Sequence, residues 1–472
     1  MAIARIQTYL LKIIPCLLAI SIAAVSSERC FAQQDFEHEA GIKKLVQPYL
    51  DANKFSAASL GISYKGKQYF LNFGKLDGQS TDAPTANTIY EIGSISKVFT
   101  GILLADAVEQ KQLKLSDTLG SLVEGLNESN PDVGAITLQQ LSNHVSGLPR
   151  MPNNMRPSDL NNPYADYDRD KMLSFLKSID DLKTKPGEKH LYSNYGVGLL
   201  GDLISTKLNQ PYDEVLQSRL TGPLKMSDTF IDVPGDQLQR FAEPHYNSGA
   251  KSYRWSFQSM AGAGGIRSTT RDMVRFIDAN LKPPSQPVGK AIELAYSKHL
   301  DPAPEHRGMG LGWMIAGDGD TRFHGGQTGG YRSMMLVSRR HNIGVVWLCD
   351  TAGSETHILA ENIIQLMMGM NVKPKSFESE FQADEKVVKR LAGKYQLFPQ
   401  TVIEVFANGN QLSVQLTKQS TMPVFAESNL VWNYKAVKAQ LVFELPEDEN
   451  KPATQVTLKQ NGRVMPAKRI ED

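Results

Sequence analysis

The stretch YEIGSISKVFT (Tyr90–Thr100) leads into the apolar helical run GILLADAVEQKQL (101–113). It places Lys97 three residues after Ser94, and residues three apart share one face of a helix. A serine hydroxyl needs an adjacent base to act as a nucleophile, and a lysine amine serves when burial or another cation keeps it neutral. A helix that opens at Ser94 would also direct backbone N–H groups toward an oxyanion. The alternative reading is a helix-capping serine followed by a solvated lysine.

Two further segments carry polar residues where an apolar element begins. In PGEKHLYSNYGVGLLG (Pro186–Gly201), the triplet Tyr192–Asn194 forms a short polar turn before a glycine-rich helix. In RFHGGQTGGYRSMMLV (Arg322–Val337), the triplet His324–Gly326 enters an apolar strand. Glycines at a strand edge let a substrate backbone lie against it. Neither segment indicates a function alone.

Together, in this order and spacing, the three segments resemble the active sites of the penicillin-recognising serine hydrolases, most closely the class C β-lactamase branch. The same resemblance extends to three more stretches: ITLQQLSNHVSGLP (Ile136–Pro149), PYDEVLQSRLTGPLKMSDTF (Pro211–Phe230) and AGAGGIRSTTRDMVRF (Ala261–Phe276). It covers about residues 35 to 370. It implies an α+β fold, with an antiparallel sheet flanked by helices and a mainly helical subdomain.

The resemblance implies a role for each matching residue. Ser94 is the acylated nucleophile, and Lys97 holds the proton network beside it. Tyr192 is the general base, which protonates the leaving group and later activates the deacylating water. Asn194 contacts the substrate amide. The backbone N–H groups of Ser94 and Gln327 form the oxyanion hole.

One departure from the family pattern affects the expected substrate. The class C enzymes have Lys-Thr-Gly where this chain has His324-Gly325-Gly326. We expect Gly326 to line the substrate-binding edge and His324 to lie beside a substrate carboxylate. An unperturbed histidine has a pKa near ~6.5, so it would be partly charged at neutral pH. Arg332 could supply a compensating positive charge.

The resemblance favours an exported serine hydrolase that opens β-lactams or cleaves D-amino-acid peptides derived from peptidoglycan, and it would allow association with the cell wall. Two alternatives are a carboxylesterase on the same fold and a non-catalytic penicillin- or peptidoglycan-binding protein. A net charge of +1 without a basic run gives no electrostatic case for a nucleic-acid partner. Ser94 lies in no G-x-S-x-G motif, which disfavours an α/β-hydrolase.

We expect no cofactor and no catalytic metal. The sequence HEAGI has Ile42 where an H-E-x-x-H motif needs its second histidine, and the chain has no cysteine–histidine cluster. His144, within SNHVSGLP, is expected to order a loop, and His190 is expected to lie on the surface. These readings leave serine chemistry as the prediction.

The N-terminus is typical of a secretory signal. Arg5 and Lys12 precede the apolar run Ile13–Val25, and cleavage after Ala32 would leave the periplasm as the destination. An uncleaved anchor is the alternative. Only Cys349 of the three cysteines would survive cleavage, so no internal disulfide forms, and its apolar setting predicts an inert core thiol.

The composition changes after Met370. We expect a signal peptide over 1–32, a hydrolase domain over 33–372, a polar linker over 373–385 and a small all-β domain over 386–472. Strand-like runs at both ends of the hydrolase region are expected to join in one antiparallel sheet. Eight short strand-like runs in the C-terminal domain predict a small antiparallel barrel or sandwich.

Overall fold

The computed structural model describes most of the chain after the predicted signal. The described residues are 36–76, 82–247, 249–301, 308–377, 381–417, 419, 421–434, 437, 439–460 and 462–470. The predicted signal peptide, residues 1–32, lies outside these ranges and stays a prediction, as does export to the periplasm. Among the described helices, none combines the length and the apolar character that crossing a bilayer requires.

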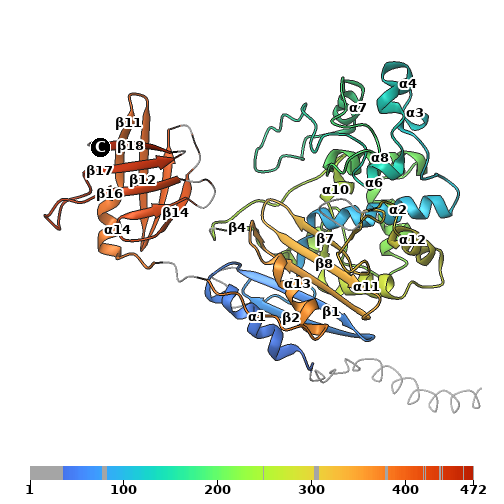
Figure 1. Ribbon diagram of the computed structural model, residues 1–472, viewed down its shortest axis with the longest axis horizontal. Coiled ribbons are helices and arrows are strands. Elements are labelled where there is room, and N and C mark those ends of the chain that lie inside the picture. The colour runs from blue at the N-terminus through green and yellow to red at the C-terminus, as the bar shows by residue number, and fades with distance from the viewer. Residues whose placement is uncertain are drawn as a thin grey trace, which may run out of the picture. The chain divides into compact units, whose positions relative to one another are not determined.

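A six-stranded antiparallel sheet joins the two ends of the hydrolase region. The strand order is β2-β1-β9-β8-β7-β6, and Figure 1 shows the blue strands β1 and β2 beside the orange strands β7 and β8. The strands are β1 (Ala57–Tyr64), β2 (Lys67–Gly74), β6 (Met314–Ile315), β7 (Arg322–Gln327), β8 (Arg332–Ser338) and β9 (Ile343–Cys349). The expected single sheet is therefore confirmed.

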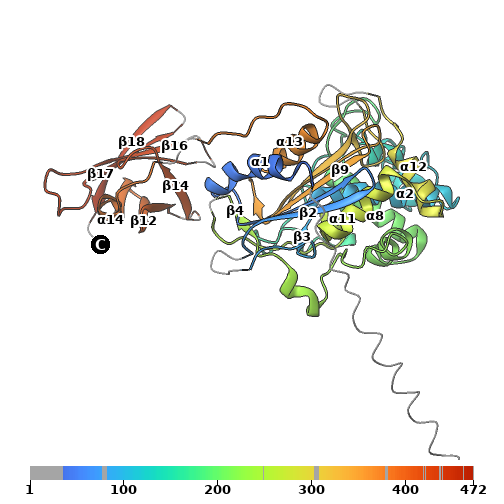
Figure 2. The same cartoon turned by 90° about the horizontal axis from the view of Figure 1, so that it is seen from below.

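Helices cover both faces of this sheet. Strands β1 and β9 are buried along their whole length, as expected of central strands that are covered on both sides. Figure 2 shows α1 and α13 on one side and α11 on the other. The helices are α1 (Glu39–Asp51), α11 (Thr270–Leu281) and α13 (His357–Met367). In α1 the buried residues Ile42, Leu45, Val46 and Tyr49 form a stripe at helical spacing.

The residues between the sheet strands form a mainly helical region, as the resemblance implied. Its helices are α2 (Ser96–Glu109), α3 (Leu119–Leu122), α4 (Leu126–Ser129), α5 (Pro131–Gly134), α6 (Leu138–Ser142), α7 (Arg169–Lys177), α8 (Asn194–Leu208), α9 (Tyr212–Leu216), α10 (Ala261–Gly264) and α12 (Pro287–Tyr296). Two short strand pairs accompany them: β3 (Ile89–Glu91) with β5 (Arg267–Thr269), and β4 (His245–Tyr246) with β10 (Thr351–Ala352).

Helix α2 is the central element of this region. It packs against α8, α10 and α12, and every residue from Ser96 to Ala107 is buried. Its sequence is apolar on all sides rather than on one stripe, which is typical of a helix enclosed by other elements. Lys97 and Asp106, the charged residues within Ser96–Ala107, are therefore buried with it.

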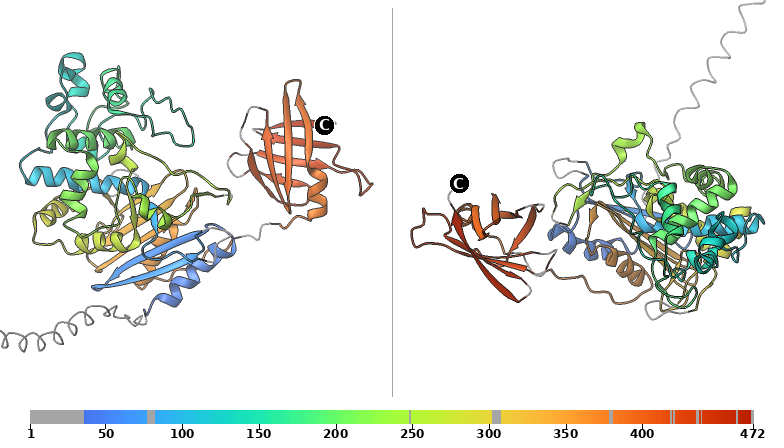
Figure 3. Two further views of the ribbon diagram at one scale, coloured as in Figure 1. Left: turned by 180° about the vertical axis from the view of Figure 1, so that it is seen from behind. Right: turned by 90° about the horizontal axis from the view of Figure 1, so that it is seen from above.

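The C-terminal residues form a closed eight-stranded antiparallel barrel (Figure 3). Its strands are β11 (Gly393–Phe398), β12 (Thr401–Asn408), β13 (Gln411–Leu416), β14 (Met422–Ala426), β15 (Val431–Asn433), β16 (Ala439–Glu444), β17 (Gln455–Gln460) and β18 (Arg463–Ile470). Helix α14 (Glu385–Leu391) packs against β12 and β13. Each of the eight predicted strand-like runs corresponds to one strand. Because the sheet closes on itself, the domain is a barrel and not a sandwich.

The barrel has a hydrophobic core of its own. That core includes Trp432, Leu441 and Val456 from the strands, and Val388 and Leu391 from α14. It also includes Ala383, which falls inside the stretch predicted as a linker. The predicted domain boundaries otherwise stay a prediction.

We predict that a chain of residues 33–377, without the barrel, folds and keeps a reactive Ser94. Phe377 is retained because its ring lies 4.8 Å from that of Tyr49 and 5.2 Å from the Lys54 ammonium. Circular dichroism would follow cooperative unfolding, and a fluorophosphonate probe would report Ser94, with the full chain as the reference. Insoluble or unlabelled shortened protein would show that the hydrolase region depends on the barrel.

Candidate active site

Ser94 lies in a single 3-10 turn, Gly93–Ile95, immediately before α2. Strand β3 delivers the chain to this turn, held by antiparallel pairing of β3 with β5 and by the Ile92 N–H, which donates to the Ile266 carbonyl at 3.0 Å. Ser94 is half-buried. Lys97 follows in the first turn of α2, so the two side chains meet one helical turn apart, as the spacing predicted.

The amine of Lys97 is fully buried beside the serine hydroxyl. Its Nζ lies 2.9 Å from Ser94 Oγ and donates to the Ala263 carbonyl at 2.5 Å. Burial holds the pKa of Lys97 well below its usual value of 10.5, and the positive charge of Arg150 lowers it further. A buried neutral amine at this distance is the arrangement in which lysine can take a proton from a serine.

Tyr192 lies across the same hydroxyl. The Lys97 Nζ is 5.0 Å from the Tyr192 ring centroid. Burial raises the pKa of Tyr192 to about 12, although a hydrogen bond with Ser94 and the charge of Arg150 both lower it. A phenol with this pKa is neutral at pH 7. The structure therefore favours Lys97 over Tyr192 as the resting base, which differs from the role that the resemblance implied.

His144 supports the loop that carries Tyr192. Its Nδ1 accepts a hydrogen bond from the Ser193 N–H at 3.1 Å, and its ring lies 4.3 Å from that of Tyr192. This contact agrees with the expectation that His144 orders a loop. His190 is half-buried, with its ring 5.7 Å from that of His144, so it lies only partly at the surface.

Two glycines bring β7 against the nucleophile turn. A Cβ on Gly93, where φ is +52°, would lie 2.7 Å from the Gln327 N. A Cβ on Gly326 would lie 2.0 Å from the Ile92 carbonyl oxygen. The backbones of Ser94 and Gln327 are therefore neighbours, as an oxyanion hole built from their N–H groups requires.

His324 is buried near the tyrosine, with 6.3 Å between the two rings. Burial lowers the pKa of His324 to about 3. The expectation that His324 is partly charged near neutral pH is therefore wrong. Its Nδ1 lies 2.7 Å from the Gly325 carbonyl, which can only accept, so Nδ1 carries the proton and Nε2 is an acceptor.

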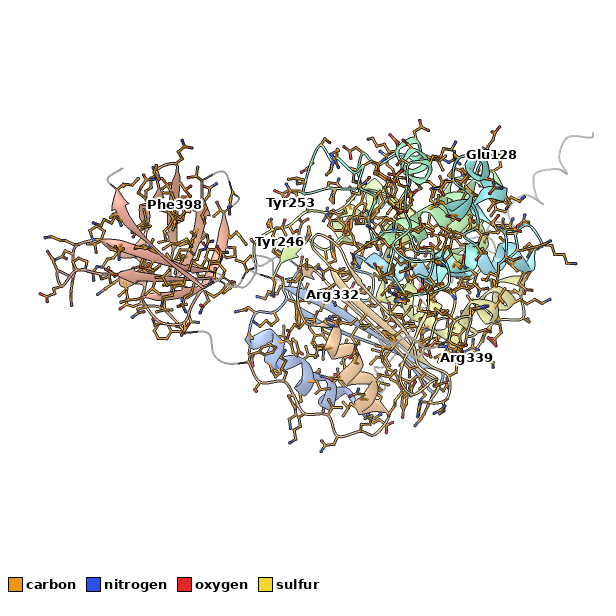
Figure 4. The ribbon with its side chains drawn as sticks, turned by 45° about the horizontal axis from the view of Figure 1, so that its top comes forward. Glu128, Tyr246, Tyr253, Arg332, Arg339 and Phe398 are labelled. Atoms are coloured by element: carbon orange, nitrogen blue, oxygen red, sulfur yellow. The ribbon has the colours of Figure 1, made fainter. Side chains whose placement is uncertain are left out.

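The remaining predicted binding residues lie at the rim of the site. Asn194 begins α8, and its Nδ2 contacts the sulfur of Met151 at 3.5 Å. Arg332, labelled in Figure 4, begins β8. It donates to Gln327 Oε1 at 2.8 Å and to His357 Nδ1 at 3.3 Å. Two of its three guanidinium nitrogens, Nε and Nη1, are thus held by protein groups.

The structure adds residues that the motifs did not indicate. The Cζ of Arg150 lies 5.0 Å from the Tyr192 ring centroid. Beside it, the half-buried rings of Tyr164, Trp255 and Phe257 form a cluster with centroids 4.8 to 6.3 Å apart. The only sequence signal for Arg150 is its position directly after the SGLP stretch. Tertiary contacts bring the aromatic rings together, and no motif contains them.

The described residues show neither a cluster of metal ligands nor an exposed thiol. Within the described ranges, no group of three or more histidine, cysteine, aspartate or glutamate side chains is placed to hold a metal ion. Cys349 is fully buried in β9, and burial raises the pKa of its thiol to about 12. A thiol with this pKa stays protonated and unreactive at neutral pH.

We predict that Gly93→Ala slows acylation of Ser94 by at least about 100-fold, because the new methyl group displaces Gln327 from the oxyanion hole. Gly66→Ala is the matched control. Gly66 also has a positive φ, +79°, but a Cβ there has no atom within 4 Å. Both variants should lose about 1–2 kcal/mol of stability from the left-handed backbone. The rate of fluorophosphonate labelling separates them, and equal rates would argue against this oxyanion hole.

Comparisons with known proteins show what the chain is similar to. A beta-lactamase from Escherichia coli (strain K12) is 28% identical over 285 residues, which are 59% of this chain and 72% of that protein. A beta-lactamase from Pseudomonas fluorescens is 29% identical over 278 residues, 58% of this chain and 73% of that protein. Among solved structures, a beta-lactamase/D-alanine carboxypeptidase from Pseudomonas syringae superposes with a TM-score of 0.60 at 21% identity. That match covers 69% of this chain and 97% of the other.

The model of the Beta-lactamase family matches residues 42–366, which contain every residue of the site described above. This span is more than half of the chain. The C-terminal barrel lies outside it. The chain belongs to the beta-lactamase family.

Proposed function

We propose that this protein is an exported serine hydrolase that works through an acyl-enzyme on Ser94. The observation that carries the proposal is the fully buried Lys97 amine, 2.9 Å from the Ser94 hydroxyl. A merely structural serine and lysine at this spacing would place the ammonium in water, where it is well solvated. Burying a lysine is costly and is retained where the neutral amine is needed.

The proposed chemistry divides proton transfer between two residues. Neutral Lys97 takes the proton from Ser94 as Oγ attacks the substrate carbonyl. The backbone N–H groups of Ser94 and Gln327 stabilise the oxyanion. Tyr192, as a neutral phenol, gives its proton to the leaving atom and regains one from Lys97. Water then attacks the acyl-enzyme carbonyl. Tyr192 and Lys97 carry the proton of this water back to Ser94 Oγ by the reverse transfers, which regenerates the free enzyme.

The substrate class is a small amide or ester. The names of the relatives support β-lactams or D-alanine peptides as substrates. A neutral His324 and the hydroxyl-free Gly325 support the alternative of an ester substrate, because this chain lacks the lysine and threonine that bind a carboxylate in class C enzymes. A non-catalytic binding protein would form a stable adduct and would not release product.

The central experiment compares Ser94→Ala with Ser96→Ala. Ser96 is buried, and its Oγ accepts the Ile266 N–H at 3.1 Å, so its loss should affect stability alone. We expect the wild type and Ser96→Ala to be acylated by a fluorophosphonate at Ser94, located by mass spectrometry. Ser94→Ala should stay unlabelled. Labelling at another serine would overturn the proposal.

Three reporter substrates separate the candidate functions. A chromogenic cephalosporin, a fluorescent penicillin and p-nitrophenyl acetate would be given to the wild type and to Ser94→Ala. Turnover of the cephalosporin supports the β-lactam reading, and turnover of the acetate alone supports the esterase. A penicillin adduct that persists for hours without product supports a binding protein or a D,D-peptidase.

We predict an acid limb in the pH profile of kcat/KM for p-nitrophenyl acetate that reports Lys97. The base works only when it is unprotonated, so activity is present above the lowered pKa of Lys97 and falls as pH drops through it. The limb should lie well below pH 10.5. The groups that face the amine are the Arg150 guanidinium and, across the site, Tyr192 and His324, and the last two are neutral at neutral pH.

Lys97→Ala should lower kcat/KM by about 10²–10⁴-fold. Added methylamine should restore part of that activity in proportion to its free-base concentration, because only a neutral amine accepts the proton. Rescue that follows the protonated amine instead would show that Lys97 acts through its positive charge.

A further inference from the structure

We propose that Arg150 is the residue that binds an anionic group, such as a carboxylate, on the leaving-group half of the substrate. The inference rests on the proposed function, because it assigns the substrate chemistry of that same site. Arg150, which lies outside the family motifs, takes the carboxylate-binding role that the sequence predicted for His324.

The backbone of Arg150 is fixed to the start of α8. The Arg150 carbonyl accepts the N–H groups of Asn194 and Tyr195 at 3.0 and 3.2 Å. The preceding carbonyl, of Pro149, accepts the Ser193 hydroxyl at 2.7 Å. These bonds tie Arg150 to the residues on the C-terminal side of Tyr192, so the position of its Cα relative to the tyrosine does not depend on a mobile loop.

The side chain of Arg150 is exposed at this place. Its guanidinium lies over the ring of Tyr192, 5.0 Å from the centroid. Within the part of the chain that the structure describes, no carboxylate or carbonyl forms a hydrogen bond or an ion pair with this guanidinium. Its five N–H donors therefore face solvent beside the catalytic residues, and a planar fork of donors matches a carboxylate.

The other basic groups near Ser94 are unsuitable for this task. His324 is neutral and presents an acceptor at Nε2, which repels a carboxylate. Lys97 is buried, and its Nζ is already engaged by Ser94 and the Ala263 carbonyl. Arg332 is half-buried and donates to Gln327 and His357. Of these groups, Arg150 alone combines a permanent charge with a guanidinium that has no hydrogen-bond partner among the described residues.

The Arg150 guanidinium lies over Tyr192, and this position places it beside the leaving-group half of the substrate. In the proposed chemistry, Tyr192 protonates the leaving atom, so the leaving group passes next to the phenol. A carboxylate that approaches an aromatic face without a cation is disfavoured by the negative face of the ring. The guanidinium over that face reverses the local electrostatics and makes the approach favourable.

The test uses two esters that share one acyl group: phenyl acetate and 3-carboxyphenyl acetate. Both form the same acetyl-enzyme, so kcat/KM compares them at the acylation step, and they differ by a carboxylate on the leaving group. Arg150→Gln should lower kcat/KM for the carboxylate ester at least about tenfold more than for phenyl acetate. Arg150→Lys should recover part of the difference, since it keeps a point charge without the fork.

Two control variants make the comparison specific. Arg156→Gln removes a nearby exposed arginine whose Nη1 donates to the backbone carbonyls of Asn153 and Met155. Arg156→Gln should leave the ratio of kcat/KM for the two esters unchanged. Arg332→Gln tests the competing assignment: a loss of carboxylate preference in that variant, with none in Arg150→Gln, would overturn the inference.

Failure of the inference is distinguishable from failure of the proposed function. If Arg150→Gln lowers kcat/KM equally for both esters, Arg150 acts only on Lys97 and Tyr192, and the inference is wrong. If the wild type hydrolyses neither ester and Ser94 is not labelled, the proposed function is wrong. Binding of 3-hydroxybenzoate, followed by ligand-observed NMR, then tests Arg150 without turnover. An affinity at least about tenfold weaker in Arg150→Gln supports the assignment, and an unchanged affinity overturns it.

Discussion

The burial of the Lys97 amine is the constraint on which the active site depends. An ammonium enclosed by apolar helices carries a large desolvation cost, and this cost lowers the pKa of Lys97 well below its usual value. Helix α2 makes this possible because it is buried from Ser96 to Ala107 and packs against α8, α10 and α12. The carbonyl of Ala263 and the hydroxyl of Ser94 satisfy the amine. The helical region is thus the enclosure that holds the Lys97 amine away from water beside Ser94.

The second requirement is the contact between the nucleophile turn and β7. The carbonyl of Ile92 accepts the Ser333 hydroxyl at 2.8 Å, and it lies where a side chain on Gly326 would clash. Residues more than 230 positions apart in the sequence are thereby held in contact. This is why one sheet must contain strands from both ends of the hydrolase region: β7 carries the Gln327 backbone to Ser94 only if the sheet brings it there.

Charge at the site is distributed unevenly. Burial lowers the pKa of both Lys97 and His324, and the exposed Arg150 places a guanidinium beside Tyr192. One charge then has two effects. It lowers the pKa of Lys97 and of Tyr192, which favours the deprotonated forms, and it offers an anion a place to bind. A family pattern based on motif residues contains no information about this balance.

The sequence by itself determined the elements and the order of the chemical groups. The alternation of strand-like runs predicted the sheet that joins both ends, and eight short runs predicted an antiparallel β unit, because local periodicity reflects which face is buried. The spacing of Ser94 and Lys97 predicted their meeting, since one helical turn separates them. Only the tertiary structure decided the charge state of His324, the closure of the barrel and the position of Arg150 over Tyr192. Those properties arise from contacts between segments that are distant in sequence and from the loss of water around them, and no local pattern of residues records either.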